Sequence, residues 1–260
     1  MLANKPIHVA LQKIPEGAVK QVISISMALM AATLAVPVAA AETISLTTGN
    51  GVSSGLKAPG EAVIFSSSQG PVTITGWSVD YNDTIRKGQL GVWSSGVGVQ
   101  NSRTDNSHTI DNKGWTDFIL LQFENAVVLN SAQFNTGWQW MWDTDATIGF
   151  GVLPLSDVSD LEGETWPISW LTTYESGAVG FSGNSLRDIN PNGESGDIWL
   201  IGASFNNPDW KADGFKLASI TVSAVPEPST WLLLLFGIGA IGAAMRAQRA
   251  GRATRVSFAF

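Results

Sequence analysis

Two charge-free apolar segments, one near each end of the chain, delimit the part that can fold as a compact domain. Residues 21–41 and residues 229–245 contain no Asp, Glu, Lys or Arg. Segments of this kind act as export signals or membrane anchors. The folded domain is therefore expected in residues 42–224, and no linker or fixed-period repeat divides that region further.

The N-terminal segment has the layout of a secretory signal peptide. Three lysines within the first 20 residues form a basic region, a mainly apolar stretch follows, and small residues precede Glu42. Signal peptides share this order of basic region, apolar region and A-x-A-like cleavage site. We expect a signal peptide over residues 1–41, cleaved after Ala40 or Ala41. A retained membrane anchor is the alternative, although the apolar run is shorter than the roughly 20 residues that a spanning helix needs.

The C-terminal segment combines three features in order. The triplet Pro226-Glu227-Pro228 is followed at once by the charge-free residues 229–245, and then by four arginines. At about 1.5 Å per residue, this stretch is enough for a short membrane-spanning helix. The arginines favour the cytoplasmic side, which puts the preceding domain outside. The prolines disfavour helix and keep the triplet extended. A Pro-x-Pro sequence alone would indicate only a stiff linker.

Together these residues resemble the PEP-CTERM sorting signal of Gram-negative bacteria. The resemblance implies a substrate of exosortase, a membrane cysteine protease-transpeptidase that cuts near the triplet. It implies that Pro226, Glu227 and Pro228 are recognition residues and not catalytic ones. Residues 225–260 would then comprise the motif, a single transmembrane helix and a basic tail. The protein would cross the inner membrane, stay anchored in it transiently, and reach the cell surface or the extracellular space.

The central region has the pattern of an all-β domain. Residues 72–79 alternate between apolar and polar side chains, as a half-buried strand does. Clusters of Gly, Asn, Asp and Pro separate further short runs that are rich in β-branched or aromatic residues. We predict an antiparallel β-sandwich or jelly roll, with one or two helical turns at residues 166–176. The further runs are residues 118–123, 126–129, 148–152, 198–201 and 215–222.

Composition excludes several classes of function. The chain has no cysteine, which removes disulfides, thiol nucleophiles and cysteine-bound metal centres. Residues 42–224 contain 20 acidic and 8 basic residues. Such an acidic surface repels phosphates and anionic headgroups, so nucleic acid is not an expected partner. Cations are the more plausible partners.

Short acidic and amide side chains gather in two parts of the central region. Their oxygens suit Ca²⁺, which takes six to eight ligands at about 2.3–2.6 Å. The spacing does not match an EF-hand loop, and the same side chains commonly brace turns, which we favour over calcium binding. No other cofactor is expected. The candidate ligands are Asp105, Asp111, Asn112 and Asp117 in the first part, and Asp143 and Asp145 in the second.

His108 is the imidazole that remains once His8 is removed with the signal peptide. As a general acid or base it would need Asp105 or Asp111 within hydrogen-bond reach. We expect no serine nucleophile beside it. A structural histidine that braces two loop groups is the favoured interpretation.

Trp138, Trp140 and Trp142 stand at alternating positions, so a strand would place all three on one face. Exposed, they would form a stacking platform for sugar rings, and buried, they would belong to the core. We favour burial, because three exposed indoles would make a large apolar patch.

Residues 96–123 carry a second resemblance. A Gly-rich strand leads through His-x-x-Asp-Asn, a glycine and an aspartate to a hydrophobic strand. This pattern is similar to one group of exosortase-dependent surface proteins without an assigned activity.

We expect a non-enzymatic surface or extracellular-matrix protein associated with exopolysaccharide. Its expected partners are exosortase, the cytoplasmic membrane before processing, and extracellular polysaccharide or envelope components. The alternative is a secreted carbohydrate-active enzyme or a glycan-binding module. A cleft with two carboxyls about 5 to 9 Å apart, one of them with a raised pKa, would favour the enzyme.

Overall fold

The computed structural model describes residues 40–49, 51–101, 107–136, 143–153, 158–177, 184–207, 209–225 and 228–251. For residues 159–160, 228–231 and 247–251 it describes the backbone alone. The chain divides into two compact units, one of residues 39–225 and one that contains residues 226–260. The predicted signal peptide lies almost wholly outside the described residues and stays a prediction, as do the predicted domain boundaries.

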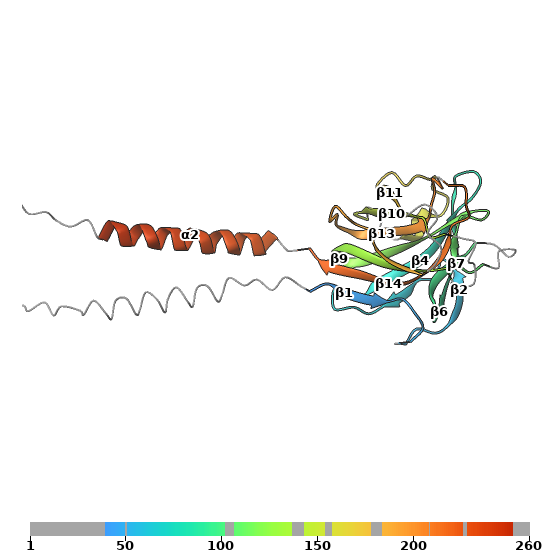
Figure 1. Cartoon of the computed structure of the whole chain (residues 1–260), viewed down its shortest axis with the longest axis horizontal. Coiled ribbons are helices and arrows are strands. Elements are labelled where there is room, and N and C mark those ends of the chain that lie inside the picture. Colours follow the sequence, from blue (N-terminus) through green and yellow to red (C-terminus); the bar gives the residue numbers. More distant parts are fainter. Residues whose placement is uncertain are drawn as a thin grey trace, which may run out of the picture. The chain divides into compact units, whose positions relative to one another are not determined.

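The first unit is built from antiparallel strands (Figure 1). Every pairing between the named strands is antiparallel, which confirms the predicted all-β class. The strands are β1 (Glu42–Ser45), β2 (Gly55–Pro59), β3 (Val63–Phe65), β4 (Val72–Val79), β5 (Ile85–Lys87), β6 (Gln89–Trp93), β7 (Gly96–Gln100), β8 (Ile110–Asp111), β9 (Thr116–Asn135), β10 (Ala146–Gly151), β11 (Thr172–Ser176), β12 (Ser185–Asp188), β13 (Gly196–Ala203) and β14 (Gly214–Ala224).

The long strand β9 connects the two halves of this sheet. Its first half pairs with β4 and β13, and its second half pairs with β12 and β14. Sequence patterns predicted separate strands at residues 118–123 and 126–129, but the structure has one strand of 20 residues. Three exposed residues beginning with Glu124 mark the point where β9 passes from one set of partners to the other. The polar residues that resemble a turn in the sequence therefore lie inside one strand, at the point where its neighbouring strands change.

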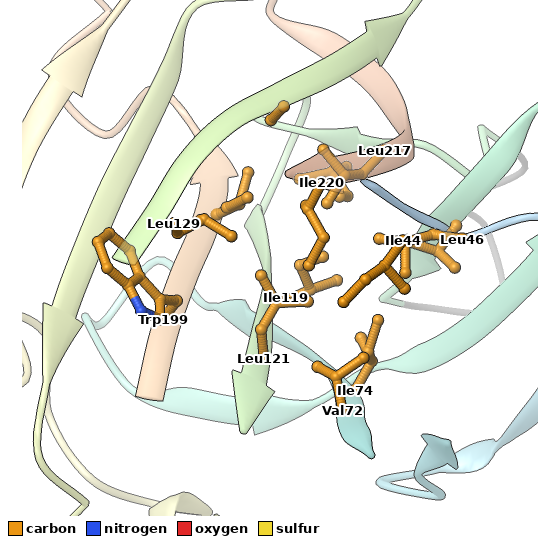
Figure 2. Packing of buried hydrophobic residues seen from close by; sticks show 14 of the residues in the cluster. Ile44, Leu46, Val72, Ile74, Ile119, Leu121, Leu129, Trp199, Leu217 and Ile220 are labelled. Carbon is orange, nitrogen blue, oxygen red and sulfur yellow. The ribbon is translucent and has the colours of Figure 1, made fainter. Parts of the chain in front are cut away.

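The larger hydrophobic core collects side chains from both halves of the sheet (Figure 2). Ile44 of β1 and Ile220 of β14 belong to it together with Ile74 of β4 and Ile119 of β9. Each of these side chains is at most 3% exposed. Full burial of an isoleucine contributes about 1.5–3 kcal/mol, so this sandwich-like core is a main source of stability.

A second, smaller core lies on the opposite face of β4, β9 and β13. Phe118 and Leu120 of β9 point into it, whereas their neighbours Ile119 and Leu121 point into the larger core. The short 3₁₀ helix η1 (Val158–Leu161) contributes two residues to this smaller core. Both faces of β9 are buried here, which explains its continuous apolar sequence.

The predicted helical turns at residues 166–176 are wrong. Strand β11 occupies the second half of that range and pairs with β10. Its Thr172-Thr173-Tyr174 sequence consists of β-branched and aromatic residues, which fit a strand better than a helix.

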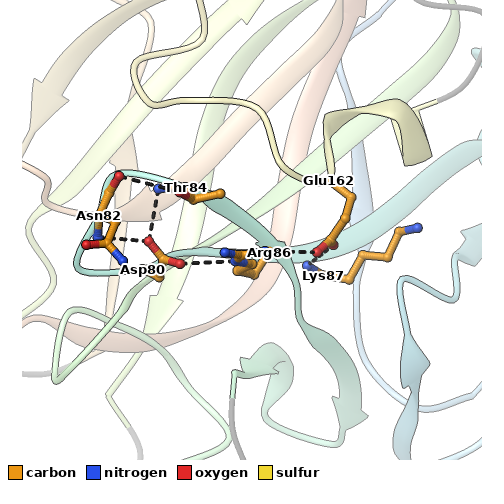
Figure 3. A network of polar contacts seen from close by, with 6 residues as sticks. All are labelled: Asp80, Asn82, Thr84, Arg86, Lys87 and Glu162. Carbon is orange, nitrogen blue, oxygen red and sulfur yellow. Dashed lines mark hydrogen bonds and ion pairs between the residues drawn. The ribbon is translucent and has the colours of Figure 1, made fainter.

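A polar network fixes the segment that covers the smaller core (Figure 3). Asp80 accepts hydrogen bonds from the backbone N–H of Thr84 and from Arg86 Nε, both at 3.0 Å. Arg86 also lies 3.9 Å from Glu162, which accepts a 2.7 Å hydrogen bond from the Lys87 N–H. The β4–β5 turn and the residues after η1 are thereby joined.

The described part of the second unit is one helix, α2 (Pro228–Gly251). Proline suits the first position of a helix, where its missing N–H is not needed. Leu232, Leu233 and Phe236 are each more than half exposed. Among the described residues, no helix reaches the length and apolar character required to cross a bilayer. The transmembrane assignment of this helix stays a prediction.

Candidate functional site

Three buried carboxylates meet at one end of the β unit. Asp143 and Asp145 lie just before β10, and Asp213 lies just before β14. One carboxylate oxygen from each lies within 4.8 Å of the other two. The residues are 1%, 5% and 0% exposed, respectively. We call these three residues the aspartate cluster.

Backbone hydrogen bonds hold the two segments of the cluster together. Asp143 and Asp213 form an isolated parallel bridge. The Asp143 N–H donates to the carbonyl of Ala212 at 3.3 Å, and the Gly214 N–H donates to the carbonyl of Asp143 at 3.0 Å. The Ser204 N–H donates to the carbonyl of Asp145 at 3.2 Å. The sequence predicted a turn at residues 143–145, but this segment is buried against the strand ends.

Asn112 braces Asp213 from the turn between β8 and β9. Its Nδ2 donates to Asp213 Oδ2 at 2.5 Å and to the carbonyl of Ser204 at 3.2 Å. Its Oδ1 accepts a 2.9 Å hydrogen bond from the Asp213 N–H. Both ends of the amide are thus used to fix one aspartate.

The partly buried cation Arg187 acts on the cluster electrostatically but donates its hydrogen bonds to other partners. Its guanidinium donates to Thr144 Oγ1 at 3.0 Å, to the Thr144 carbonyl, and to the Ser176 carbonyl at 3.2 Å. It also lies 4.1 Å from the centre of the Phe134 ring. Burial lowers the pKa of Arg187 to about 10, although the three aspartates act in the opposite direction. No salt bridge joins Arg187 to a carboxylate in the described parts of the chain.

Burial also changes the acidity of the cluster. It raises the pKa of Asp145, and the charge of Asp143 raises it further. It raises the pKa of Asp213 to about 9, with added contributions from Asp143 and Asp145, while the hydrogen bond from Asn112 acts in the opposite direction. The ionised forms of these groups are therefore costly unless a cation or a proton offsets them.

Asp111 and Asp117, also predicted as calcium ligands, are engaged elsewhere. Asp111 accepts hydrogen bonds from the hydroxyls of Ser107 and Thr109 at 2.5 and 2.8 Å, and from the Lys113 N–H at 3.0 Å. Asp117 accepts from the Ser78 hydroxyl at 2.6 Å and from Asn101 Nδ2 at 2.9 Å. The contacts of Asp111 fit the turn-bracing interpretation, whereas Asp117 lies within β9 and contacts Ser78 of the neighbouring strand β4.

His108 lies against an aromatic ring. Its ring stacks on Trp93 with centroids 5.4 Å apart, and the ammonium of Lys216 lies 3.7 Å from the centre of a Trp93 ring. The His108 backbone has a φ of 49°, in the left-handed region. Its Nδ1 is buried without a hydrogen-bond partner among the described residues. The acid–base role predicted for His108 stays a prediction, since Asp105 lies outside the described residues.

Several predicted site residues fall outside the described residues. They include Asp105, the first two residues of the triplet (Pro226 and Glu227), and the three tryptophans of the possible sugar platform. Pro228 is described by its backbone and begins α2. The residues of the platform are Trp138, Trp140 and Trp142.

The aspartate cluster does not offer a glycosidase-like pair in an open cleft. The aspartate cluster has close carboxyls and a raised pKa, but its members are at most 5% exposed. A pocket of about 270 Å³ beside β1 has one carboxylate, Glu42, among its described lining residues. A catalytic pair has to reach the glycosidic bond from both sides. The aspartate cluster is better suited to hold a cation than a sugar.

Comparison with known proteins identifies the C-terminal region. Residues 224–250 match the family model of the PEP-CTERM protein-sorting motif. No curated protein matches the chain. The matched region contains the Pro226-Glu227-Pro228 triplet and nearly all of α2. The chain therefore carries a PEP-CTERM protein-sorting motif, as its sequence predicted, and this motif is consistent with an exosortase substrate.

Proposed function

We propose that the protein is a non-enzymatic component of the cell surface or extracellular matrix, delivered there by exosortase and associated with exopolysaccharide. The PEP-CTERM motif supports export, transit through a membrane-anchored form, and sorting to the surface. The β unit is then the delivered domain.

The observation that carries this proposal is the position of the motif directly after the last strand. Strand β14 ends at Ala224, where the matched region begins. Neither hydrophobic core contains a residue beyond Val222. A cut near the triplet would therefore release the β unit without removing a strand or a core side chain.

The exposed apolar surface of α2 supports transit through a membrane. Leu232, Leu233, Leu235 and Phe236 are 55%, 65%, 63% and 74% exposed. Large exposed apolar side chains that gather on one element mark contact with a partner or with a membrane. Lipid is the environment that would cover it before processing.

The burial of the aspartate cluster supports a non-enzymatic role. Its carboxylates, each within 4.8 Å of the others, are buried and not accessible to a polysaccharide. The acidic balance of residues 42–224 favours contacts mediated by cations and by neutral sugar surfaces.

Sorting is tested by the intact mass and the subcellular fraction of the protein in an exosortase-containing host. The wild type is expected to lose its tail near the triplet and to leave the membrane fraction. Loss of exosortase, or replacement of Pro226, Glu227 and Pro228 by alanine, should leave the full chain in the membrane. The matched control, Pro191→Ala with Glu194→Ala, changes the same residue types in an exposed turn and should be processed normally. A triplet variant that is cut and released like the wild type would refute the sorting step.

Matrix association is tested separately with the released protein. It should remain with the exopolysaccharide of a producing strain and appear in the free medium of a strain without that polymer. No oligosaccharide should be liberated from the isolated polymer. Liberated oligosaccharides would establish the enzymatic alternative, and equal release from both strains would refute the association.

A further inference from the structure

We propose that Asp143, Asp145 and Asp213 bind one calcium ion, and that Asn112 positions Asp213 as one of its ligands. The site would join the segment before β10 to the segment before β14. It is independent of the sorting motif and would act on the stability of the β unit.

The distances within the aspartate cluster fit a single ion. Ca²⁺ binds oxygen ligands at about 2.3–2.6 Å, so two ligands on opposite sides of the ion are separated by about 4.6–5.2 Å. The three carboxylates each offer an oxygen within 4.8 Å of the others. One ion can therefore contact all three residues without a large rearrangement.

The carboxylate oxygens lack the partners that turn-bracing aspartates have. Asp143 is 1% exposed, and neither of its carboxylate oxygens has a hydrogen-bond partner in the described parts of the chain. One oxygen of Asp145 and one of Asp213 are likewise buried without a partner there. In contrast, Asp111 accepts three hydrogen bonds. Buried ionised groups without partners are strongly unfavourable, so these four oxygens point to a bound cation.

The charges around the cluster also favour a divalent ion. Among the described residues, the three aspartates face the partly buried Arg187, whose hydrogen bonds go to Thr144 and Ser176. The other basic residue in the vicinity, Lys211, pairs with Asp209 at 2.9 Å. Because Glu175 adds a further negative charge near Asp145, negative charge exceeds positive charge around the cluster, and a divalent cation would reduce that excess.

The donor chemistry selects among metals. The cluster contains carboxylates and no histidine or cysteine, a set that suits hard cations and not Zn²⁺ or copper. Mg²⁺ prefers a regular octahedron at about 2.0–2.1 Å with several retained waters, whereas Ca²⁺ accepts bidentate carboxylates in an irregular site. Three buried carboxylates held by strand ends fit calcium better.

A proton shared between Asp213 and Asp143 is the alternative explanation, because it would also reduce the repulsion between the carboxylates of the cluster. The two explanations differ in their response to added metal. The full chain, purified in detergent, is freed of metal with EDTA and titrated with CaCl₂ and with MgCl₂ while binding heat and thermal unfolding are followed. Calcium is expected to bind at one ion per chain and to raise the unfolding temperature, and magnesium to do so more weakly.

Variants assign the site. Asp145→Asn and Asp213→Asn should abolish the calcium response, yet unfold in EDTA at the wild-type temperature or above it, because they remove repulsion. Asn112→Ala should weaken calcium binding about 10- to 100-fold, as expected for a residue that orients a ligand. The control Asp111→Asn should lower the unfolding temperature but keep the calcium response. No binding heat and no calcium-dependent unfolding in the wild type would refute the site, as would a calcium response that survives in both Asp145→Asn and Asp213→Asn.

Discussion

Replacing Arg187 by methionine tests how the buried charges of the β unit are balanced. Methionine keeps an unbranched apolar side chain but removes the guanidinium and, with it, the cation–π contact with Phe134. Two hydrogen bonds at ordinary distance, to Thr144 Oγ1 and to the Ser176 carbonyl, are lost. The aspartate cluster also loses a favourable electrostatic interaction with the partly buried guanidinium.

The expected cost follows from these contacts. A hydrogen bond from a charged donor contributes about 1.5 kcal/mol at the low end of the usual range. The contact with the Phe134 ring adds about 0.5–1 kcal/mol. The free energy of unfolding should therefore fall by about 3–4 kcal/mol, or roughly 10 °C in unfolding temperature for a domain of this size. Arg187→Lys, which keeps the charge but not the planar fork, should lose about half as much.

Urea denaturation followed by tryptophan fluorescence measures the change. Leu186→Ala is the matched control, since Leu186 is the preceding residue of β12 and is 65% exposed. Its effect should stay within about 0.5 kcal/mol. An Arg187→Met protein as stable as the Leu186→Ala protein would show that the guanidinium does not offset the cluster, and would refute the charge balance described here.

Two further substitutions test the strand packing and the response to pH. Gly98→Ala places a Cβ atom 2.2 Å from the His108 carbonyl oxygen, and because backbone atoms must shift, stability in urea should fall by about 1–3 kcal/mol. Gly149→Ala, which meets side-chain atoms at 3.1 Å or more, should cost less, and equal losses would contradict this packing. Burial raises the pKa of Tyr174, whose hydroxyl donates to the Ile189 carbonyl, to about 12. Since the unfolded value is about 10, the stability from the protonated hydroxyl is full below pH 10 and is lost as the pH rises through 12. Tyr174→Phe should remove this alkaline loss and cost about 1 kcal/mol at neutral pH, whereas an unchanged alkaline unfolding profile would contradict it.

The position of strand β4 was predictable from the local pattern, but its burial was not. Residues 72–79 alternate in sequence and form β4 with the same bounds, yet seven of its eight residues are buried, whereas alternation predicted one exposed face. The continuity of β9 was not predictable, because Glu124 and its polar neighbour look like a turn when the partner strands are unknown. The residues of β11 were assigned to helical turns because pairing with β10 depends on a segment remote in sequence.

The sequence identified some residues of the candidate site and missed another, because the missing one is placed by a contact between distant segments. Asp143, Asp145 and Asn112 stand out as short polar side chains in turn-like sequence. Asp213 does not, because its neighbours suggest only the start of a strand. Its place beside Asp143 comes from a bridge between distant backbone segments, and no spacing rule encodes such a bridge.

The pairing of β1 with β14 has a consequence for the order in which the domain folds. Glu42 pairs with Val222, so the first strand of the domain needs the last one as its neighbour. β14 also pairs with β7, β8 and β9, and these long-range contacts cannot form while β14 is missing. In a chain that leaves the cytoplasm from its N-terminus, β14 emerges immediately before the sorting motif. Completion of the sheet and arrival of the membrane anchor would therefore coincide, and the domain would close while it is still tethered.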